Sequence, residues 1–166
     1  DQQLIHDTIE EIKDQAEKKK IKLSVHWLVE EGEDNKLTGL SVLGNYLQLQ
    51  RALINILNNA INYNHEDGLV DVTVEKLEQE QVQIKIEDTG PGIDPADLPH
   101  IFERFYRADK ARSRTSGGTG LGLAITREIV ARHHGTIKVD SVLGKGTTFI
   151  INLPIFLPAF AGVSQE

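Results

Sequence analysis

Five asparagines stand within ten residues, in the segment NILNNAINYN at positions 55–64. If the segment is an α-helix, the spacing puts Asn55, Asn59, Asn62 and Tyr63 on one face, apart from the apolar stripe of the same helix. Asparagine is a poor helix former. A neutral amide oxygen can ligate Mg²⁺, and an amide NH₂ can donate to a phosphate. A polar, solvent-facing helix surface is the alternative, and the asparagines alone do not decide between the two.

A carboxylate continues the apolar alternation of a predicted strand. Val82, Ile84 and Ile86 alternate with polar residues, so Asp88 falls on the same, core-facing side. A carboxylate there is costly unless it is hydrogen-bonded, and an exocyclic amine such as that of adenine would satisfy it. The glycines of DTGPGI (88–93) would let a flat ligand approach the backbone. An aspartate that ends a strand and caps a turn is the alternative.

Glycines are concentrated where a further helix begins, in SGGTGLGLAI at positions 116–125. The spacing is neither that of a Walker A loop nor that of the dinucleotide fingerprint. Free N–H groups at a helix N-terminus still form an anion site, and the basic stretch at 103–114 could supply further cations. The alternative is a flexible loop with solvated charges. The segment GKGTTF at 144–149 is weak evidence taken alone.

Helices alternating with strand pairs must position these groups. Apolar spacing predicts helices over 4–19, over 46–63 and through about 134, where Gly135 provides a stop. Alternation predicts strands around 21–27, 70–74, 82–86, 136–141 and 147–154, and a short strand or turn at 37–44. This order indicates an α+β fold, a two-layer α/β sandwich.

Composition excludes several classes of protein. The 166 residues are 39% hydrophobic and 26% charged, as in a globular domain. No apolar run approaches the roughly 20 residues that span a bilayer, and the formal net charge of −7 argues against nucleic-acid binding. Without cysteine, no disulfide or thiolate chemistry is available. Because the chain starts at Asp1, we expect it to be a piece of a longer protein.

Together, the asparagine helix, DTGPGI, IFERFYR, GGTGLGLAI and GKGTTF resemble the five conserved boxes of one family. This family is the catalytic ATP-binding domain of bacterial sensor histidine kinases, in the superfamily of gyrase B, Hsp90 and MutL. The resemblance implies a Bergerat-type fold, with a mixed, mostly antiparallel sheet covered on one face by about three helices. It implies a catalytic domain at 1–158, a mobile ATP lid at about 95–118 and a C-terminal tail at 159–166, with the dimerisation and phosphoacceptor domain absent.

The resemblance also implies roles for individual residues. Asn59 would be the Mg²⁺ ligand, and Asn55 and Arg107 would act in catalysis, Arg107 near the γ-phosphate. Asp88 would bind the adenine amino group, with Thr147 or Thr148 assisting through water. The other nucleotide-binding positions would be Asn62, Tyr63, Gly90, Gly92, Ile93, Phe105, Gly118, Thr119, Gly120, Leu121, Gly122 and Leu123.

The implied function is transfer of the ATP γ-phosphoryl group to a histidine on a separate dimerisation hairpin, for relay to a response regulator. The parent would be a homodimer anchored in the cell membrane with this domain in the cytoplasm, and the isolated fragment would not autophosphorylate. Alternatives are an ATPase or conformational switch of the gyrase B or Hsp90 type, and a non-catalytic nucleotide sensor. Asn55 stands where the ATPases have a water-activating Glu, which favours the kinase. Asn62 stands where many family members have a phosphate-contacting Lys.

Overall fold

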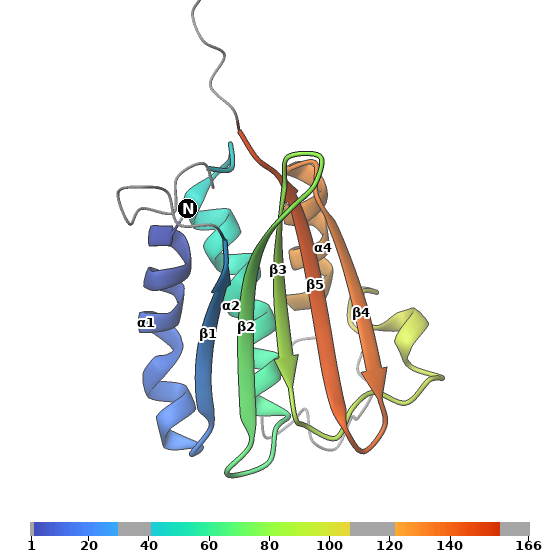
Figure 1. Ribbon diagram of the computed structural model, residues 1–166. Helices are drawn as coiled ribbons and strands as arrows, with labels where there is room; N and C mark the ends of the chain where they lie inside the picture. Colours follow the sequence, from blue (N-terminus) through green and yellow to red (C-terminus); the bar gives the residue numbers. More distant parts are fainter. Residues whose placement is uncertain (1, 30–40, 107–121, 157–166) are drawn as a thin grey trace, which may run out of the picture.

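Three α-helices pack against one face of a five-stranded sheet in the computed structural model, which describes residues 2–29, 41–106 and 122–156 (Figure 1). The elements are α1 (Gln2–Lys18), β1 (Lys22–Leu28), α2 (Tyr46–Asn62), β2 (Leu69–Leu77), β3 (Gln81–Asp88), the short 3₁₀ helix η1 (Leu98–His100), α4 (Gly122–Arg132), β4 (Thr136–Val142) and β5 (Gly146–Pro154). The strand order is β1-β2-β3-β5-β4, with β1 parallel to β2 and the other pairs antiparallel. The predicted two-layer α+β sandwich with a mixed, mostly antiparallel sheet is confirmed.

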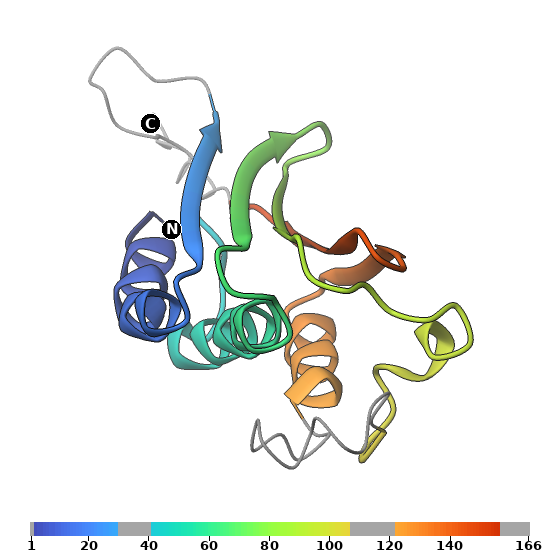
Figure 2. The same ribbon diagram turned by 90° about the horizontal axis from the view of Figure 1, so that it is seen from below.

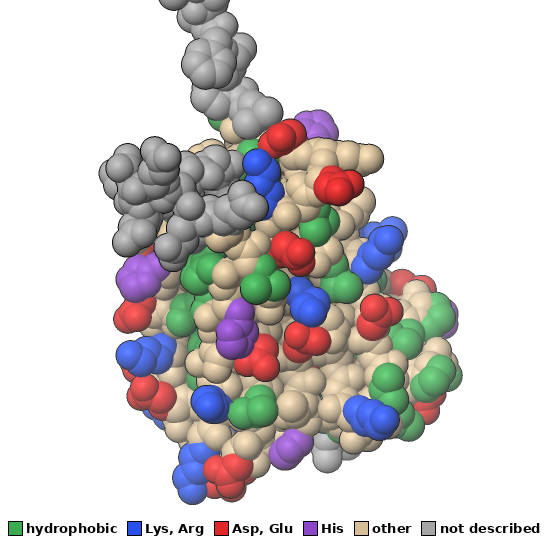
Figure 3. Space-filling view, in the orientation of Figure 1, with side chains coloured by type: hydrophobic (Ala, Val, Ile, Leu, Met, Phe, Trp, Pro, Cys, Tyr) green, Lys and Arg blue, Asp and Glu red, His purple; other side chains and the backbone are tan. Residues whose placement is uncertain are grey.

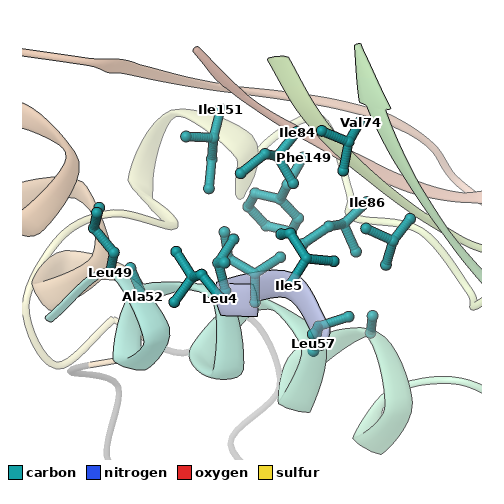
Figure 4. Packing of buried hydrophobic residues seen from close by; sticks show 14 of the residues in the cluster. Leu4, Ile5, Leu49, Ala52, Leu57, Val74, Ile84, Ile86, Phe149 and Ile151 are labelled. Atoms are coloured by element: carbon teal, nitrogen blue, oxygen red, sulfur yellow. The ribbon is translucent and has the colours of Figure 1, made fainter. Parts of the chain in front are cut away.

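Apolar alternation along the three central strands builds the sheet side of the core. The inward residues of β2, β3 and β5 are almost fully buried: Val70, Val72, Val74, Val82, Ile84, Ile86, Phe149, Ile151 and Leu153. Leucines, isoleucines and alanines of α1 and α2 pack onto them from the helix layer (Figure 4). Burying each branched aliphatic side chain contributes roughly 1.5–3 kcal/mol. This burial stabilises the packing of α1 and α2 against the sheet. Residues 41–44 of the predicted segment 37–44 are not part of a strand, and residues 37–40 lie outside the described part of the chain.

Helix α2 lies between α1 and α4, and all three cover the same side of the sheet (Figure 2). Asn45 caps α2, because its side-chain oxygen accepts a hydrogen bond from the Gln48 backbone N–H at 3.0 Å. His133, just beyond the end of α4, accepts a bond from the Asn45 N–H at 3.0 Å through Nε2, while its Nδ1 lies 2.7 Å from the Ile129 carbonyl oxygen. This buried imidazole thus joins the end of α4 to the start of α2.

The opposite face of the sheet is polar. Acidic and basic side chains are interspersed over it (Figure 3), including the ion pair of Lys85 with Glu87 and the contact of the His26 ring with the Asp71 carboxylate at 3.5 Å. Alternation along the strands puts these residues outward and the aliphatic residues inward. Within the described residues, no helix has the length and apolar character to cross a membrane.

Candidate nucleotide-binding site

The carboxylate of Asp88 lies at the end of β3, on the face that the helices cover. Its Oδ1 accepts a hydrogen bond from the Gly90 N–H at 2.9 Å and a longer one from the Thr147 N–H at 3.3 Å. Burial raises the pKa of Asp88 above its ordinary value, and these two backbone donors partly offset that rise. No bond to Oδ2 occurs among the described residues. This oxygen can therefore accept from a ligand.

The loop after Asp88 packs tightly onto the turn between β4 and β5. A Cβ on Gly92, where φ is +74°, would stand 2.3 Å from the Val142 carbonyl oxygen. A Cβ on Gly146 would stand 2.0 Å from the Asp88 carbonyl oxygen. Neither contact leaves room for a side chain. These two glycines are thus required by contacts within the protein itself, because they let the loop after β3 pack directly against the end of β4 and the start of β5.

Strand register decides which threonine lies next to Asp88. Thr147 is directly opposite Asp88 across β3 and β5, so both side chains lie on the same face. Thr148 is opposite Glu87 and therefore faces the other side of the sheet. Tyr63, at the end of α2, comes close to the same place, because a Cβ on Gly90 would stand 3.3 Å from its carbonyl oxygen. The structure brings Thr147, Tyr63 and Gly90 to Asp88, and it does not bring Thr148.

The asparagines of α2 have different surroundings. The Asn55 amide donates to the Gly122 carbonyl oxygen at 3.2 Å and to the Thr126 hydroxyl at 3.3 Å, which ties α2 to the first turn of α4. The half-buried Asn59 amide, one turn further on, has no hydrogen-bond partner among the described residues. An amide oxygen without a protein partner suits a hard cation such as Mg²⁺, so Asn59 fits the ligand role that the resemblance implies.

Asn62 contacts the other neighbouring helix. Its side-chain oxygen accepts a hydrogen bond from the Gln15 amide of α1 at 2.9 Å, and its carbonyl oxygen accepts one from the Lys19 ammonium. Helix α1 lies on the opposite side of α2 from α4 (Figure 2). The Asn62 side chain therefore joins α1 to α2, and the structure does not bring it to Asp88.

The described part of the predicted lid, residues 95–106, follows the Asp88 loop. Phe102 packs edge-on against Phe149 of the core, with ring centroids 6.3 Å apart, and the Arg127 guanidinium lies 5.9 Å from the Phe102 ring. Phe105 is 72% exposed and adopts a left-handed backbone conformation with φ +64°. That conformation is unusual for a bulky side chain. Phe102 thus fixes this segment to the core, while Phe105 is left available to a ligand or partner.

The first turn of α4 is the remaining described part of the predicted phosphate site. Gly122 begins the helix and Leu123 packs against the core. Five predicted residues, Arg107, Gly118, Thr119, Gly120 and Leu121, lie outside the described residues, as does the rest of the predicted lid through 118. Among the described residues, no group of three or more His, Cys, Asp or Glu side chains is arranged to hold a metal ion.

The motifs did not point to two polar residues of this site, Ser141 and Thr126. The Ser141 hydroxyl accepts a hydrogen bond at 2.7 Å from the N–H of Ile93, which is one of the predicted residues. Ser141 itself was not predicted, although its place next to the end of a strand, facing inward with Ile137 and Val139, was a readable signal. Thr126, whose hydroxyl donates to the Gly122 carbonyl oxygen at 2.8 Å, is buried on α4 and gave no comparable signal.

Known proteins are similar to this chain both in sequence and in fold. Residues 44–156 match the family model "Histidine kinase-, DNA gyrase B-, and HSP90-like ATPase". The sensor histidine kinase RppB of Synechocystis is 51% identical over 113 residues, which are 68% of this chain and 25% of RppB. The solved structure of the mycobacterial sensor histidine kinase MprB superposes with a TM-score of 0.76 at 29% identity, over 93% of this chain and 95% of that one. Full-length ShkA in complex with AMPPNP has a TM-score of 0.74 at 27% identity, over 92% of this chain and 29% of ShkA.

The chain belongs to the family of histidine kinase-, DNA gyrase B- and HSP90-like ATPases, because the family model covers more than half of it. Within that family it is an ATP-binding domain of the sensor histidine kinase type. It spans about a quarter of the length of the curated relative RppB.

Proposed function

We propose that this chain is the catalytic domain of a sensor histidine kinase, which binds Mg·ATP and presents the γ-phosphoryl group to a histidine on a separate dimerisation hairpin. The acceptor imidazole would attack the γ-phosphorus and ADP would leave. A response regulator would then take the phosphoryl group from the histidine. The parent protein would be a homodimer anchored in the bacterial membrane, with this domain in the cytoplasm.

The observation that carries the proposal is the half-buried Asp88 carboxylate at the end of β3. An ionised carboxylate accepts hydrogen bonds and donates none. Backbone donors occupy Oδ1, so Oδ2 is left for the exocyclic amine of adenine. Gly90 and Tyr63 adjoin this group and would contact the base, together with Gly92 and Ile93 of the same loop.

The phosphate end of the site would lie between α2 and the N-terminus of α4. Phosphoryl transfer depends mainly on positioning and charge stabilisation, and a helix N-terminus attracts anions. Mg²⁺ would supply charge neutralisation on the phosphate oxygens, held on the protein side by Asn59. Leu123 and Gly122 would lie beside the phosphates, with Gly118–Leu121 and Arg107 supplying further contacts. Phe105, which is 72% exposed, is proposed to approach the nucleotide. Asn62 would do so only if its side chain left its hydrogen bond to Gln15 of α1.

Asn55 supports transfer over hydrolysis. Hydrolysis requires a group that can take a proton from water, and a side-chain amide is not such a base. The Asn55 amide N–H group donates to Gly122 and Thr126, so we propose that Asn55 contributes to catalysis by holding α4 against α2. The isolated chain is therefore expected to bind ATP with little turnover.

The test is to supply the missing acceptor. The chain is expressed together with the residues that precede it in its parent protein, and acid-labile phosphohistidine is measured after incubation with Mg·ATP. We expect label on a histidine of the added hairpin and its loss in the Asn59→Ala variant. The matched control is Asn58→Ala on the same helix. Rapid phosphate release without phosphohistidine would instead identify an ATPase.

A further inference from the structure

Three polar side chains form a row across neighbouring strands, at the end of the sheet where β3 and β4 finish and β5 begins. Asp88 on β3 is directly opposite Thr147 on β5, and Thr147 is directly opposite Ser141 on β4. Directly opposed residues have their side chains on the same face, which here is the face that the helices cover. Ser141 is thus a neighbour of Thr147, and Thr147 separates it from the carboxylate.

The Ser141 hydroxyl is fully used in hydrogen bonds within the protein. Its Oγ accepts from the Ile93 N–H at 2.7 Å, and it lies 3.0 Å from the Gly146 carbonyl oxygen and 3.0 Å from the Thr147 hydroxyl oxygen. A hydroxyl has one proton and two lone pairs. All three contacts can be hydrogen bonds at the same time only if the Ser141 proton goes to the Gly146 carbonyl oxygen, which can only accept, and the Thr147 hydroxyl donates to Ser141.

This arrangement fixes the direction of the Thr147 hydroxyl. Its single proton is committed to Ser141, so the lone pairs of Thr147 Oγ1 are what it can offer to a ligand. The ionised Asp88 carboxylate beside it also only accepts. This edge of the sheet therefore offers side-chain acceptors and no side-chain donor from these three residues.

We infer that Ser141 is a specificity-determining residue, which makes the site select a base that presents an amine over a base that presents a carbonyl in the same place. The inference rests on the proposed function, in which the base of the nucleotide lies against Asp88. Adenine, with a 6-amino group, matches two acceptors. Hypoxanthine, with a 6-oxo group, opposes acceptor to acceptor, and a Thr147 proton held by Ser141 cannot relieve this.

The test is calorimetry of the whole chain with Mg·ATP and Mg·ITP, which differ in the base alone. The wild type is expected to prefer ATP. In Ser141→Ala, the Thr147 hydroxyl is released and can donate to the 6-oxo group. The ratio of ATP to ITP affinity should therefore fall by roughly threefold to tenfold, the worth of one net hydrogen bond. Ser141→Thr keeps the hydroxyl and should restore the ratio. The control Ser24→Ala, on β1 at the far side of the sheet, should leave it unchanged.

A second variant tests the inference independently, in case Ser141→Ala does not fold. Thr147→Val keeps the β-branched shape and the backbone N–H that Asp88 accepts. It should weaken ATP binding but leave ITP binding unchanged or stronger, because the wild-type hydroxyl has no proton to give to ITP and presents only lone pairs to its 6-oxo group. Equal losses for both nucleotides would overturn the inference.

The two proposals fail in different ways. If Ser141 only supports the loop through Ile93, Ser141→Ala will weaken ATP and ITP binding by the same factor. The unchanged ratio would then refute the specificity role while the proposed function stands. If the wild type binds neither nucleotide, both the proposed function and the inference are wrong.

Discussion

Replacing Asp88 by asparagine should separate nucleotide binding from folding. In Asp88→Asn the side-chain oxygen can still accept from the Gly90 and Thr147 N–H groups, which it does at 2.9 and 3.3 Å in the wild type. The second carboxylate oxygen becomes an NH₂ group, which faces the amine of adenine donor to donor. Binding thus loses a hydrogen bond to a charged group, worth about 1.5–3 kcal/mol. That corresponds to an ATP affinity roughly 10- to 150-fold weaker.

Stability should change in the opposite direction. The folded-state pKa of Asp88 is raised, mainly by burial, so the folded protein binds this proton more tightly than the unfolded chain does. The contribution to stability is therefore greatest below the ordinary carboxyl pKa and is lost as the pH rises through the raised pKa. In its ionised form Asp88 is a partly buried charge, whose burial is unfavourable, and Asp88→Asn removes that charge. We expect the variant to be as stable as the wild type or more stable.

The assay pairs calorimetry with urea denaturation at neutral pH. Thr148→Val is the matched control, because Thr148 lies on the same strand as Thr147 but faces away from Asp88. We expect weak ATP binding with an unchanged or higher free energy of unfolding for Asp88→Asn, and unchanged ATP affinity for the control. Unchanged ATP affinity in a folded Asp88→Asn protein would refute the reasoning and reduce Asp88 to a turn cap.

Three further predictions follow from the same contacts. Gly146→Ala should unfold at clearly lower urea concentration, because its Cβ would stand 2.0 Å from the Asp88 carbonyl oxygen. The control Gly144→Ala has nothing within 4 Å of its Cβ, so its free energy of unfolding should fall only by the roughly 1–2 kcal/mol of a residue held in a left-handed conformation. Equal urea midpoints for the two variants would contradict the tight loop packing. ATP affinity should fall as the pH drops through the raised pKa of Asp88, because the protonated group no longer only accepts, and calorimetry on Asp88→Asn should show a flatter pH profile. Asn55→Ala should lower the free energy of unfolding by about 0.5–1.5 kcal/mol for each lost bond to Gly122 and Thr126, and an unchanged urea midpoint would show that these bonds do not hold α4.

Local sequence patterns were enough to predict much of this site. Alternation along 82–86 placed Asp88 on the inner face, and helical spacing predicted α2 within one residue of its observed end. Both are period arguments that need only neighbouring residues. The close approach of Gly92 to Val142, and of Gly146 to Asp88, depends on how a loop packs against a distant hairpin. No local pattern encodes such a contact.

The same limit explains Ser141 and Asn62. Ser141 gains its three partners from a loop and a neighbouring strand that only the sheet order brings together. Helical spacing predicted that Asn62 shares a face of α2 with Asn55, whereas in the structure Asn55 contacts α4 and Asn62 contacts α1, on the other side of α2. The hydrogen bond of Asn62 goes to Gln15, 47 residues away, because α1 packs against α2. Which side of a helix meets which neighbour is a property of the packed layer.

The most direct test of the account is a titration of the ¹⁵N-labelled chain with Mg·ATP, followed by backbone amide shifts. The proposed site predicts saturable shifts at Gly90, Ile93 and Thr147 around the base and at Gly122 beside the phosphates. The amide of Trp27, on the edge strand β1, should not move. The absence of shifts at millimolar nucleotide, or shifts confined to β1, would contradict it.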